Sequence, residues 1–297
     1  MIPKLVIQGD AVTDKLKASD AEIKSKNSPT LGVVAICRNE QRDLGGFLQH
    51  LLPWVDEIVL VDDGSTDDTI RIAREAGPKV SLVSSPRLPG EYFSHQRNKG
   101  ISASRSDWLL HMDIDERVPP ELRREIQEGI RRTDLDGLRF HRHNFFLHRP
   151  IRGGGWQLHS YLHVARRQKF TFGGKIHEEC HLSTSANRVK PLRSLMWHFN
   201  EDSYEKRRRK SLFYTTVEAE TLLQKSVRVR LWHLTIVPFL VFIKRYFLLL
   251  GFRDGVAGWI LAFEGMASTF DAYAMAWDQQ NRIAREEIES RFESLED

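Results

Sequence analysis

Two aspartates separated by one residue have the spacing of a metal site. Asp113 and Asp115 directly follow the apolar run Trp108–Met112. Alternate residues of an extended chain point to the same side, so both carboxylates are expected to face one site. Carboxylate oxygens suit Mg²⁺ or Mn²⁺, and such an ion in turn bridges the oxygens of a diphosphate. The pattern predicts a divalent metal site where this run ends.

A second acidic pair, Asp62-Asp63, follows the apolar run Glu57–Val61 and precedes a Gly-Ser turn. A carboxylate at a strand end accepts hydrogen bonds from a base N–H or from ribose hydroxyls, and a glycine lets the backbone approach a ligand closely. The alternative is a helix N-cap, because Ser, Thr and Asp follow the glycine. Capping accounts poorly for Asp62, which lies too early in the chain. We therefore expect Asp62 to contact a nucleotide.

The elements that must position these acids alternate between strands and helices. Strands are predicted at 31–36, 57–61, 80–83 and 108–112, and helices at 39–52, 66–76, 95–104 and 119–130. This alternation indicates a parallel sheet, whose ligands bind beyond the carboxyl ends of the strands. After residue 136 we expect loops and small strands, with a flexible acceptor loop at 153–155. From Ser203 onward the chain is predicted to be helical.

Four segments between residues 31 and 130 resemble a known family in sequence and in order. They are VVAICRNE, EIVLVDDGSTDDT, QRNKGIS and WLLHMDIDERVPPEL, and they are similar to those of family 2 glycosyltransferases of the GT-A fold. The resemblance implies an α/β fold with a mostly parallel central sheet flanked by helices. It also implies a nucleotide-sugar donor, Mn²⁺ or Mg²⁺, and inversion at the anomeric carbon.

The resemblance also assigns roles to individual residues. Those implied to bind the nucleotide sugar are Arg38, Glu40, Asp62, Asp63, Arg97 and Asp113. Asp115 is implied as the principal metal ligand, and Asp113 would contact either the ribose or the metal. Arg97 would lie near the diphosphate.

The second half resembles, more loosely, bacterial glucosyltransferases of the lipopolysaccharide inner core. The segments concerned are GGKIHEEC, MWHFNEDSYEKRRRKSLFY and YFLLLGFRDGVAGWILA. An inverting transfer needs a base for the proton of the acceptor hydroxyl. The resemblance points to Glu178 in the pair His177-Glu178, with Glu179 as the alternative. His198 would help to hold the metal or the diphosphate, or else is simply packed between its aromatic neighbours.

The subfamily resemblance names UDP-glucose as the donor, and the charge distribution suggests an anionic acceptor. The chain has 44 Lys+Arg and 40 Asp+Glu, yet residues 137–177 hold eight Lys/Arg, six His and no acid. Residues 203–230 hold eight Lys/Arg against three Glu. A one-sided run of this kind suits an anionic glycan and an anionic membrane surface. Nucleic acid is not expected, because no nucleic-acid-binding motif is found.

One long apolar segment, Leu231–Leu250, raises the question of a membrane. Pro238 interrupts it and Lys244-Arg245 lie inside it. A spanning helix needs about 20 mostly apolar residues, and two central cations are costly there. We expect a helix lying in the membrane interface, with a packed helix or a true span as alternatives. Because the first ten residues lack the apolar core of a signal peptide, we expect a cytoplasmic protein, peripheral to the inner face of the cytoplasmic membrane.

These predictions divide the chain into a flexible leader (1–30), a GT-A catalytic domain (31–202) and a helical, membrane-associating region (203–297). The predicted function is that of a metal-dependent inverting glycosyltransferase acting on a lipopolysaccharide-core or other lipid-linked anionic glycan. One alternative is a sugar-nucleotide nucleotidyltransferase, but CRNEQRD has no glycine-rich loop after the first strand. The other is an inert membrane-associated nucleotide-binding protein, which the intact Asp113, Asp115 and Glu178 argue against.

Overall fold

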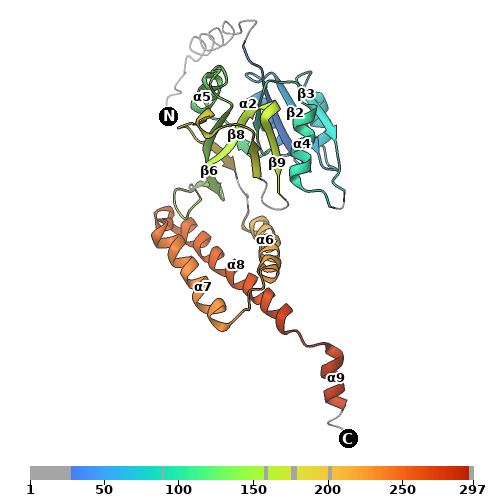
Figure 1. The fold of residues 1–297 in the computed structure, drawn as a ribbon, viewed down its shortest axis with the longest axis vertical. Coiled ribbons are helices and arrows are strands. Elements are labelled where there is room, and N and C mark those ends of the chain that lie inside the picture. Colours follow the sequence, from blue (N-terminus) through green and yellow to red (C-terminus); the bar gives the residue numbers. More distant parts are fainter. Residues whose placement is uncertain (1–27, 89, 157–159, 175–178, 200–202, 294–297) are drawn as a thin grey trace, which may run out of the picture.

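The computed structural model describes residues 28–88, 90–156, 160–174, 179–199 and 203–293. It shows a layered α/β part built on a sheet and, below it in the view of Figure 1, a group of long helices. Most of the predicted leader lies outside the described residues. Thr30, near its end, is bound to the body of the protein, because its N–H and Oγ1 both donate to the carboxylate of Asp107.

The strands are short in the first half and longer around the centre of the sheet. They are β1 (Leu31–Cys37), β2 (Glu57–Asp62), β3 (Val80–Ser84), β4 (Trp108–His111), β5 (Glu116–Arg117), β6 (Gly137–Phe146), β7 (Arg149–Pro150), β8 (Ser160–Arg166), β9 (Phe170–Gly173), β10 (Glu179–Leu182), β11 (Val189–Pro191) and β12 (Met196–Phe199). The helices are α2 (Leu44–Leu51), α3 (Thr69–Glu75), α4 (Phe93–Ala103), α5 (Pro120–Ile130), α6 (Tyr204–Gln224), α7 (Leu231–Ile243), α8 (Gly255–Asn281) and α9 (Arg285–Glu293). A π-helical turn at Lys244–Leu248 and a 3₁₀ turn at Gly251–Asp254 join α7 to α8.

The first four strands form the predicted parallel sheet, in the order β3-β2-β1-β4. The apolar runs of β1, β2 and β4 are buried almost throughout, as expected for strands covered on both faces. Helices α2 and α5 pack on one face, and α4 packs on the other with β9. Gly100 lets α4 lie against β1, because a Cβ there would come within 2.3 Å of the side chain of Val34. The mostly parallel sheet flanked by helices is confirmed.

The region after residue 136 is more regular than expected, and the prediction of small strands and loops there is wrong for β6. This ten-residue strand pairs with β8, β12, β11 and β7 and carries the sheet on to β12 and β5. Its buried face alternates Phe140 and Phe146 with the polar Arg142 and Asn144. Polar residues on this face hide the period of two that identifies a strand, and pairing with four neighbours overrides the weak local signal.

The glycine segment that was predicted to be a flexible loop is instead bonded to the helical part. The backbone N–H groups of Arg152 and Gly153 donate to the carboxylate of Asp254, at 2.9 and 2.7 Å. Gly154 N–H donates to the carbonyl of Leu249. A Cβ on Gly153 would lie 2.3 Å from the carbonyl oxygen of Leu250, so the two backbones approach as closely as glycine allows. These contacts connect the sheet to the turn between α7 and α8.

The predicted helical appendage is confirmed: α7 and α6 both pack on the long helix α8. The Arg207 guanidinium pairs with the buried Glu264, with Nε 3.1 Å from Oε2. The side chain of Arg245 packs against Gly265, where a Cβ would lie 2.8 Å from its Nε. Of the two cations within the apolar segment, Arg245 is thus turned into the bundle, whereas Lys244 is exposed.

One buried carboxylate joins several of the central strands. Asp136, immediately before β6, is 1% exposed and accepts from Arg188 Nε at 2.6 Å and Lys169 Nζ at 2.7 Å. Arg166 Nε lies 3.1 Å from its other oxygen. The Arg188 hydrogen bond, more than the opposing effect of burial, holds the pKa of Asp136 well below its usual range. The carboxylate therefore links β6 to the chain around β8, β9 and β11.

Asp136→Ala is expected to destabilise the protein by about 1.5–3 kcal/mol, because it removes charge-assisted hydrogen bonds to a buried carboxylate while the partly exposed cations around it can be solvated. Chemical denaturation of the purified variant measures the loss. The control is Asp134→Ala, which removes an exposed carboxylate paired with Arg132. Exposed pairs contribute little to stability, so the control should unfold at the wild-type denaturant concentration. Equal loss in both variants would contradict the role given to Asp136.

Candidate functional site

A cleft of about 1240 Å³ opens at the carboxyl ends of β1 and β4. Residues at or after these strand ends, including Arg38, Glu40, Asp113 and Asp115, line its floor, and α6 contributes to its wall. A smaller pocket of about 540 Å³ adjoins it and shares Arg38, Asp63 and Arg87 with it. The cleft therefore lies where ligands bind in open α/β sheets.

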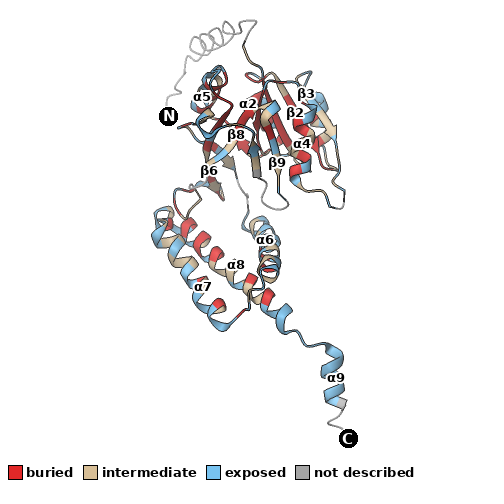
Figure 2. Cartoon of the chain, in the orientation of Figure 1, coloured by how far each residue is buried: buried red, intermediate tan, exposed pale blue. Residues whose placement is uncertain are grey.

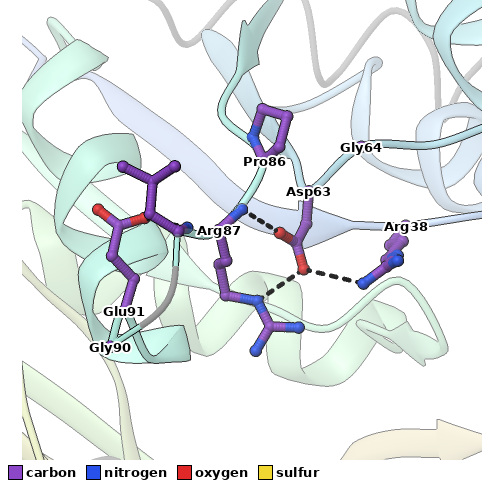
Figure 3. Close-up of a pocket in the computed structure, with 8 residues that line it drawn as sticks. Arg38, Asp63, Gly64, Pro86, Arg87, Gly90 and Glu91 are labelled. Carbon is purple, nitrogen blue, oxygen red and sulfur yellow. Dashed lines mark hydrogen bonds and ion pairs between the residues drawn. The ribbon is translucent and has the colours of Figure 1, made fainter.

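The smaller pocket is built around Asp63, as Figure 3 shows. Its carboxylate accepts from the backbone N–H of Arg87 at 2.8 Å and from Arg87 Nε at 2.7 Å. Arg38 Nη1 lies 3.9 Å away. Asp62, which was expected to contact the nucleotide, instead accepts from the N–H groups of Gly64 and Ser65 in its own turn. Of the two acids, Asp63 lines the pocket.

Asp113 is held by two arginines. Arg97 Nη2 donates to Oδ1 at 2.9 Å, and Arg142 Nη2 donates to Oδ2 at 3.2 Å. Burial alone would raise the pKa of Asp113, but the two guanidinium charges outweigh it and lower that pKa strongly. Arg142 also pairs with the buried Glu116 at 2.5 Å. Both oxygens of Asp113 are thus engaged by cations, whereas those of Asp115 are not held in this way.

Asp115 and His198 lie together in the cleft, with His198 Nε2 3.4 Å from Asp115 Oδ2. Two neighbouring ligands of an octahedral ion with bonds of about 2.1 Å lie about 3 Å apart, so this pair fits one Mg²⁺ or Mn²⁺. No group of three or more His, Cys, Asp or Glu side chains that could hold a metal is found among the described residues. Diphosphate oxygens and water would complete the shell, which is the usual arrangement for Mg²⁺.

Asn144 fixes the orientation of His198. The two residues are partners on the neighbouring strands β6 and β12. Asn144 Nδ2 donates to the carbonyl of Trp156 at 2.9 Å, so its Oδ1 must face His198 Nδ1, 2.8 Å away. An amide oxygen only accepts, hence Nδ1 carries the hydrogen and Nε2 faces Asp115. A hydrogen bond to the ring nitrogen that does not face the metal sets the tautomer of metal-binding histidines.

Glu40 is a partly buried carboxylate beside the same site. Burial first, and then the negative charge of Asp115, raises its pKa to about 7, although Lys206 partly opposes the rise. Near neutral pH the Glu40 side chain is therefore protonated in a large fraction of molecules. A cation between Asp115 and Glu40 would favour the ionised form.

The structure brings most of the predicted site residues into one cleft. Those that line it are Arg38, Glu40, Asp63, Arg97, Asp113, Asp115 and His198. Glu178, the predicted base, lies outside the described residues. Glu179, the alternative, begins β10, but its side chain is not described.

Sequence reasoning missed Arg142 and Asn144, the two side chains that position the acid and the histidine. Both lie in the basic stretch 137–177, which was interpreted only as a charged run. The available signal was the alternation of β6, in which these polar residues share a face with Phe140 and Phe146. Polar groups on the buried face of a strand require partners, and such partners often form sites.

The chain is similar in sequence to known proteins. The family model described as "Glycosyl transferase family 2" matches residues 32–195. The chain is 24% identical over 265 residues to the lipopolysaccharide core biosynthesis glycosyltransferase LpsC of Rhizobium meliloti, covering 87% of this chain and 96% of that protein. It is 26% identical over 267 residues to an uncharacterized glycosyltransferase of Rickettsia felis, covering 85% and 92%.

Solved structures show a more distant likeness. S. aureus TarS (residues 1–349) aligns with a TM-score of 0.41 at 14% identity, over 84% of this chain and 91% of that one. Glucosyl-3-phosphoglycerate synthase from Mycobacterium tuberculosis, in complex with Mn²⁺, UDP and glucosyl-3-phosphoglycerate, aligns with a TM-score of 0.42 at 17% identity. That alignment covers 75% of this chain and 88% of the synthase.

Glu40→Gln should raise the stability of the metal-free protein at high pH. With a pKa of about 7 in the folded state and 4.5 as the ordinary value, folding binds a proton between these pH values. Stability therefore falls as the pH rises through this window, and the variant avoids that loss. We expect E40Q to be about 1–3 kcal/mol more stable than the wild type at pH 8.5 and equally stable at pH 4.

Denaturant titrations at the two pH values measure this difference. The exposed Glu121→Gln controls for the removal of one negative charge from the surface. An E40Q variant whose advantage is the same at pH 4 and pH 8.5 would contradict the raised pKa.

Proposed function

The chain belongs to glycosyl transferase family 2, and from that premise we propose a metal-dependent, inverting transferase that moves glucose from UDP-glucose to a lipopolysaccharide-core or other lipid-linked anionic glycan. Family membership makes it a sugar-transferring enzyme and disfavours the nucleotidyltransferase alternative. The observation that carries the metal-dependent part is the pairing of Asp115 with His198 at the carboxyl ends of the strands.

The donor is proposed to lie from the small pocket toward Asp115. Asp63 offers a carboxylate to the base or ribose, and exchanging its Arg87 contacts for the nucleotide would open that pocket. Arg97, held by Asp113, presents a guanidinium near the place of the diphosphate. A divalent ion between Asp115 and His198 would supply charge to stabilise the departing nucleotide.

The acceptor side requires a base. In an inverting displacement, a carboxylate takes the proton of the acceptor hydroxyl while that oxygen bonds to the anomeric carbon and the diphosphate leaves from the opposite face. Glu178 remains our candidate for this role, with Glu179 as the alternative. The relative named for lipopolysaccharide core biosynthesis supports an acceptor of that class.

We propose further that the helical part lies on the inner face of the cytoplasmic membrane. One helical stretch, Leu231–Leu248, is apolar and long enough to cross a membrane, with a mean hydropathy of 1.4 and 11% of its residues buried. Figure 2 shows exposed residues over the outward side of α7. The large apolar side chains exposed on α7 and the turn after it are Leu231, Trp232, Ile236, Phe239, Leu240, Phe247 and Leu248.

The surroundings of this apolar face favour an interfacial helix over a span. Arg228 and Arg230 before α7 and Arg253 after it are exposed, so cations flank the face at both ends. Lys244 is exposed on a long stem that can reach the headgroups. Exposed apolar faces rimmed by polar residues mark protein or membrane contacts. Cations at both ends of an exposed apolar helix would attract it to anionic headgroups.

Asp115→Asn is expected to weaken Mn²⁺-dependent UDP binding and to lower turnover by roughly 100-fold or more, because a metal ligand contributes several kcal/mol to charge stabilisation. Calorimetry with UDP, with and without Mn²⁺, measures binding, and a panel of nucleotide sugars measures transfer. The matched control is Asp134→Asn, because Asp134 is exposed and does not line the cleft. Wild-type transfer rates in D115N with metal present would contradict the proposal.

The double change Leu240→Glu/Leu248→Glu should release the protein from vesicles that contain anionic lipid. Both side chains are exposed, at 56% and 73%, so the fold should tolerate the changes. Cosedimentation measures the bound fraction. Leu195→Glu/Ile288→Glu changes two other exposed apolar residues, one after β11 and one on α9. Equal vesicle binding by the wild type and the α7 variant would rule out this anchor.

A further inference from the structure

Helix α6 presents two adjacent faces with different partners. Arg207 and Ser211, four residues apart on one face, contact α8: Arg207 pairs with Glu264, and Ser211 Oγ lies 2.9 Å from Ser268 Oγ. Thr215, four residues further on, is buried. The residues that precede these three positions line the cleft; they are Lys206, Lys210 and Tyr214. The contacts with α8 thus hold the second face in a fixed position over the cleft.

The cleft face of α6 is positively charged. It carries two lysines, and none of the three glutamates within the described helix Tyr204–Gln224 lines the cleft. Two other cations of the cleft, Arg97 and Arg142, both pair with Asp113. A nucleoside-diphosphate sugar with a bound divalent ion is close to neutral, because the two phosphate charges and the ion cancel. The donor complex itself therefore needs no further cation, although Lys206 also acts on the metal side, where it lowers the pKa of Glu40.

A strained turn adds an imidazole to the same cleft. Leu147 and His148 connect β6 to β7 and both have positive φ, +48° and +62°. Two-residue hairpin turns of this form favour Asn-Gly, since a side chain is disfavoured at positive φ. Leu147 packs on the cluster that includes Ala257 and Leu261 of α8, which offsets part of this strain. His148 is exposed and lines the cleft. Local rules are usually broken where function requires it.

The cleft has room for a second substrate. Its volume of about 1240 Å³ exceeds the roughly 300–1,000 Å³ of pockets for one small ligand. Tyr161, Phe199 and Tyr214 also line it, each with 38–47% of its surface exposed. Aromatic faces and a few placed polar groups are what a sugar ring and its substituents need.

We propose that Lys206, Lys210 and His148 form an acceptor subsite that binds a phosphate group carried by the acceptor glycan. This inference rests on the proposed transfer function and deepens it by naming the anionic group and the residues that hold it. A phosphate monoester carries about −1.5 to −2 charges at neutral pH, which matches two lysines. None of the three residues lines the small pocket around Asp63, so the acceptor phosphate and the nucleotide can be bound at the same time.

The test measures the binding of three simple sugars to the full chain loaded with Mg²⁺ and UDP. Saturation-transfer NMR detects the bound sugar. The sugars are glucose 6-phosphate, glucuronate and methyl glucoside, which carry a phosphate, a carboxylate and no charge. We expect glucose 6-phosphate to bind most tightly. Lys206→Gln/Lys210→Gln should weaken it at least tenfold, and His148→Asn, which tolerates the positive φ, by a smaller factor.

The matched control is Arg208→Gln/Lys225→Gln, which removes the same charge from exposed positions of the same helix region that do not line the cleft. It should leave glucose 6-phosphate binding unchanged. UDP affinity should be the same in every variant, which shows that the fold and donor site are intact. If UDP does not bind the wild type, the transfer function fails, while the sugar titrations without UDP still report on the subsite.

Four results would overturn the subsite. The first is equal binding of glucose 6-phosphate and methyl glucoside by the wild type. The second is equal loss in the lysine variant and its control, which would reveal only a general attraction of charge. The third is displacement of bound glucose 6-phosphate when UDP is added to the UDP-free protein, which would place the phosphate in the donor site. The fourth is a lysine variant that loses binding to anionic vesicles but keeps glucose 6-phosphate, which would assign the lysines to lipid headgroups instead.

Discussion

The arrangement of the site depends on Arg142, a half-buried arginine on a central strand. Three carboxylates, those of Asp113, Asp115 and Glu116, lie within four residues at the end of β4. Burial raises the pKa of Glu116, Arg142 opposes that rise, and the charge of Asp113 adds to it. Without a cation, so many acids in one place would remain protonated or force the turn apart. Arg142 and Arg97 compensate Asp113, so Asp115 is left to face His198.

A second chain of contacts extends from this site to the helical part. Asn144 connects His198 to the carbonyl of Trp156, and the ring of Trp156 lies under the Arg207 guanidinium, 5.2 Å from its centre. Arg207 in turn pairs with Glu264 of α8. The glycine segment before Trp156 is bonded to the turn between α7 and α8. The helical part is therefore attached to the loop that supports the histidine, and it forms one wall of the cleft.

How far the sequence predicted the fold follows from how each element is buried. Strands β1, β2 and β4 were predicted because both of their faces are covered, which leaves continuous apolar runs. Strand β6 was missed because its buried face carries Arg142 and Asn144, whose partners come from β4, β12 and the loop at Trp156. The different surroundings of Asp62 and Asp63 could not be read from the sequence either, since they depend on the turn that bonds to Asp62 and on Arg87, which bonds to Asp63.

The sequence by itself determined the family, the acids at the strand ends and the separation of charge along the chain, because each depends only on residues that are neighbours in the sequence. Only the tertiary structure decided which of those acids forms ion pairs with arginine, which nitrogen of His198 faces Asp115 and where the lysines of α6 lie. These depend on contacts between residues dozens of positions apart, such as Arg142 with Asp113 and Asn144 with His198. The spacing of residues in one segment carries no information about the partner that another segment brings.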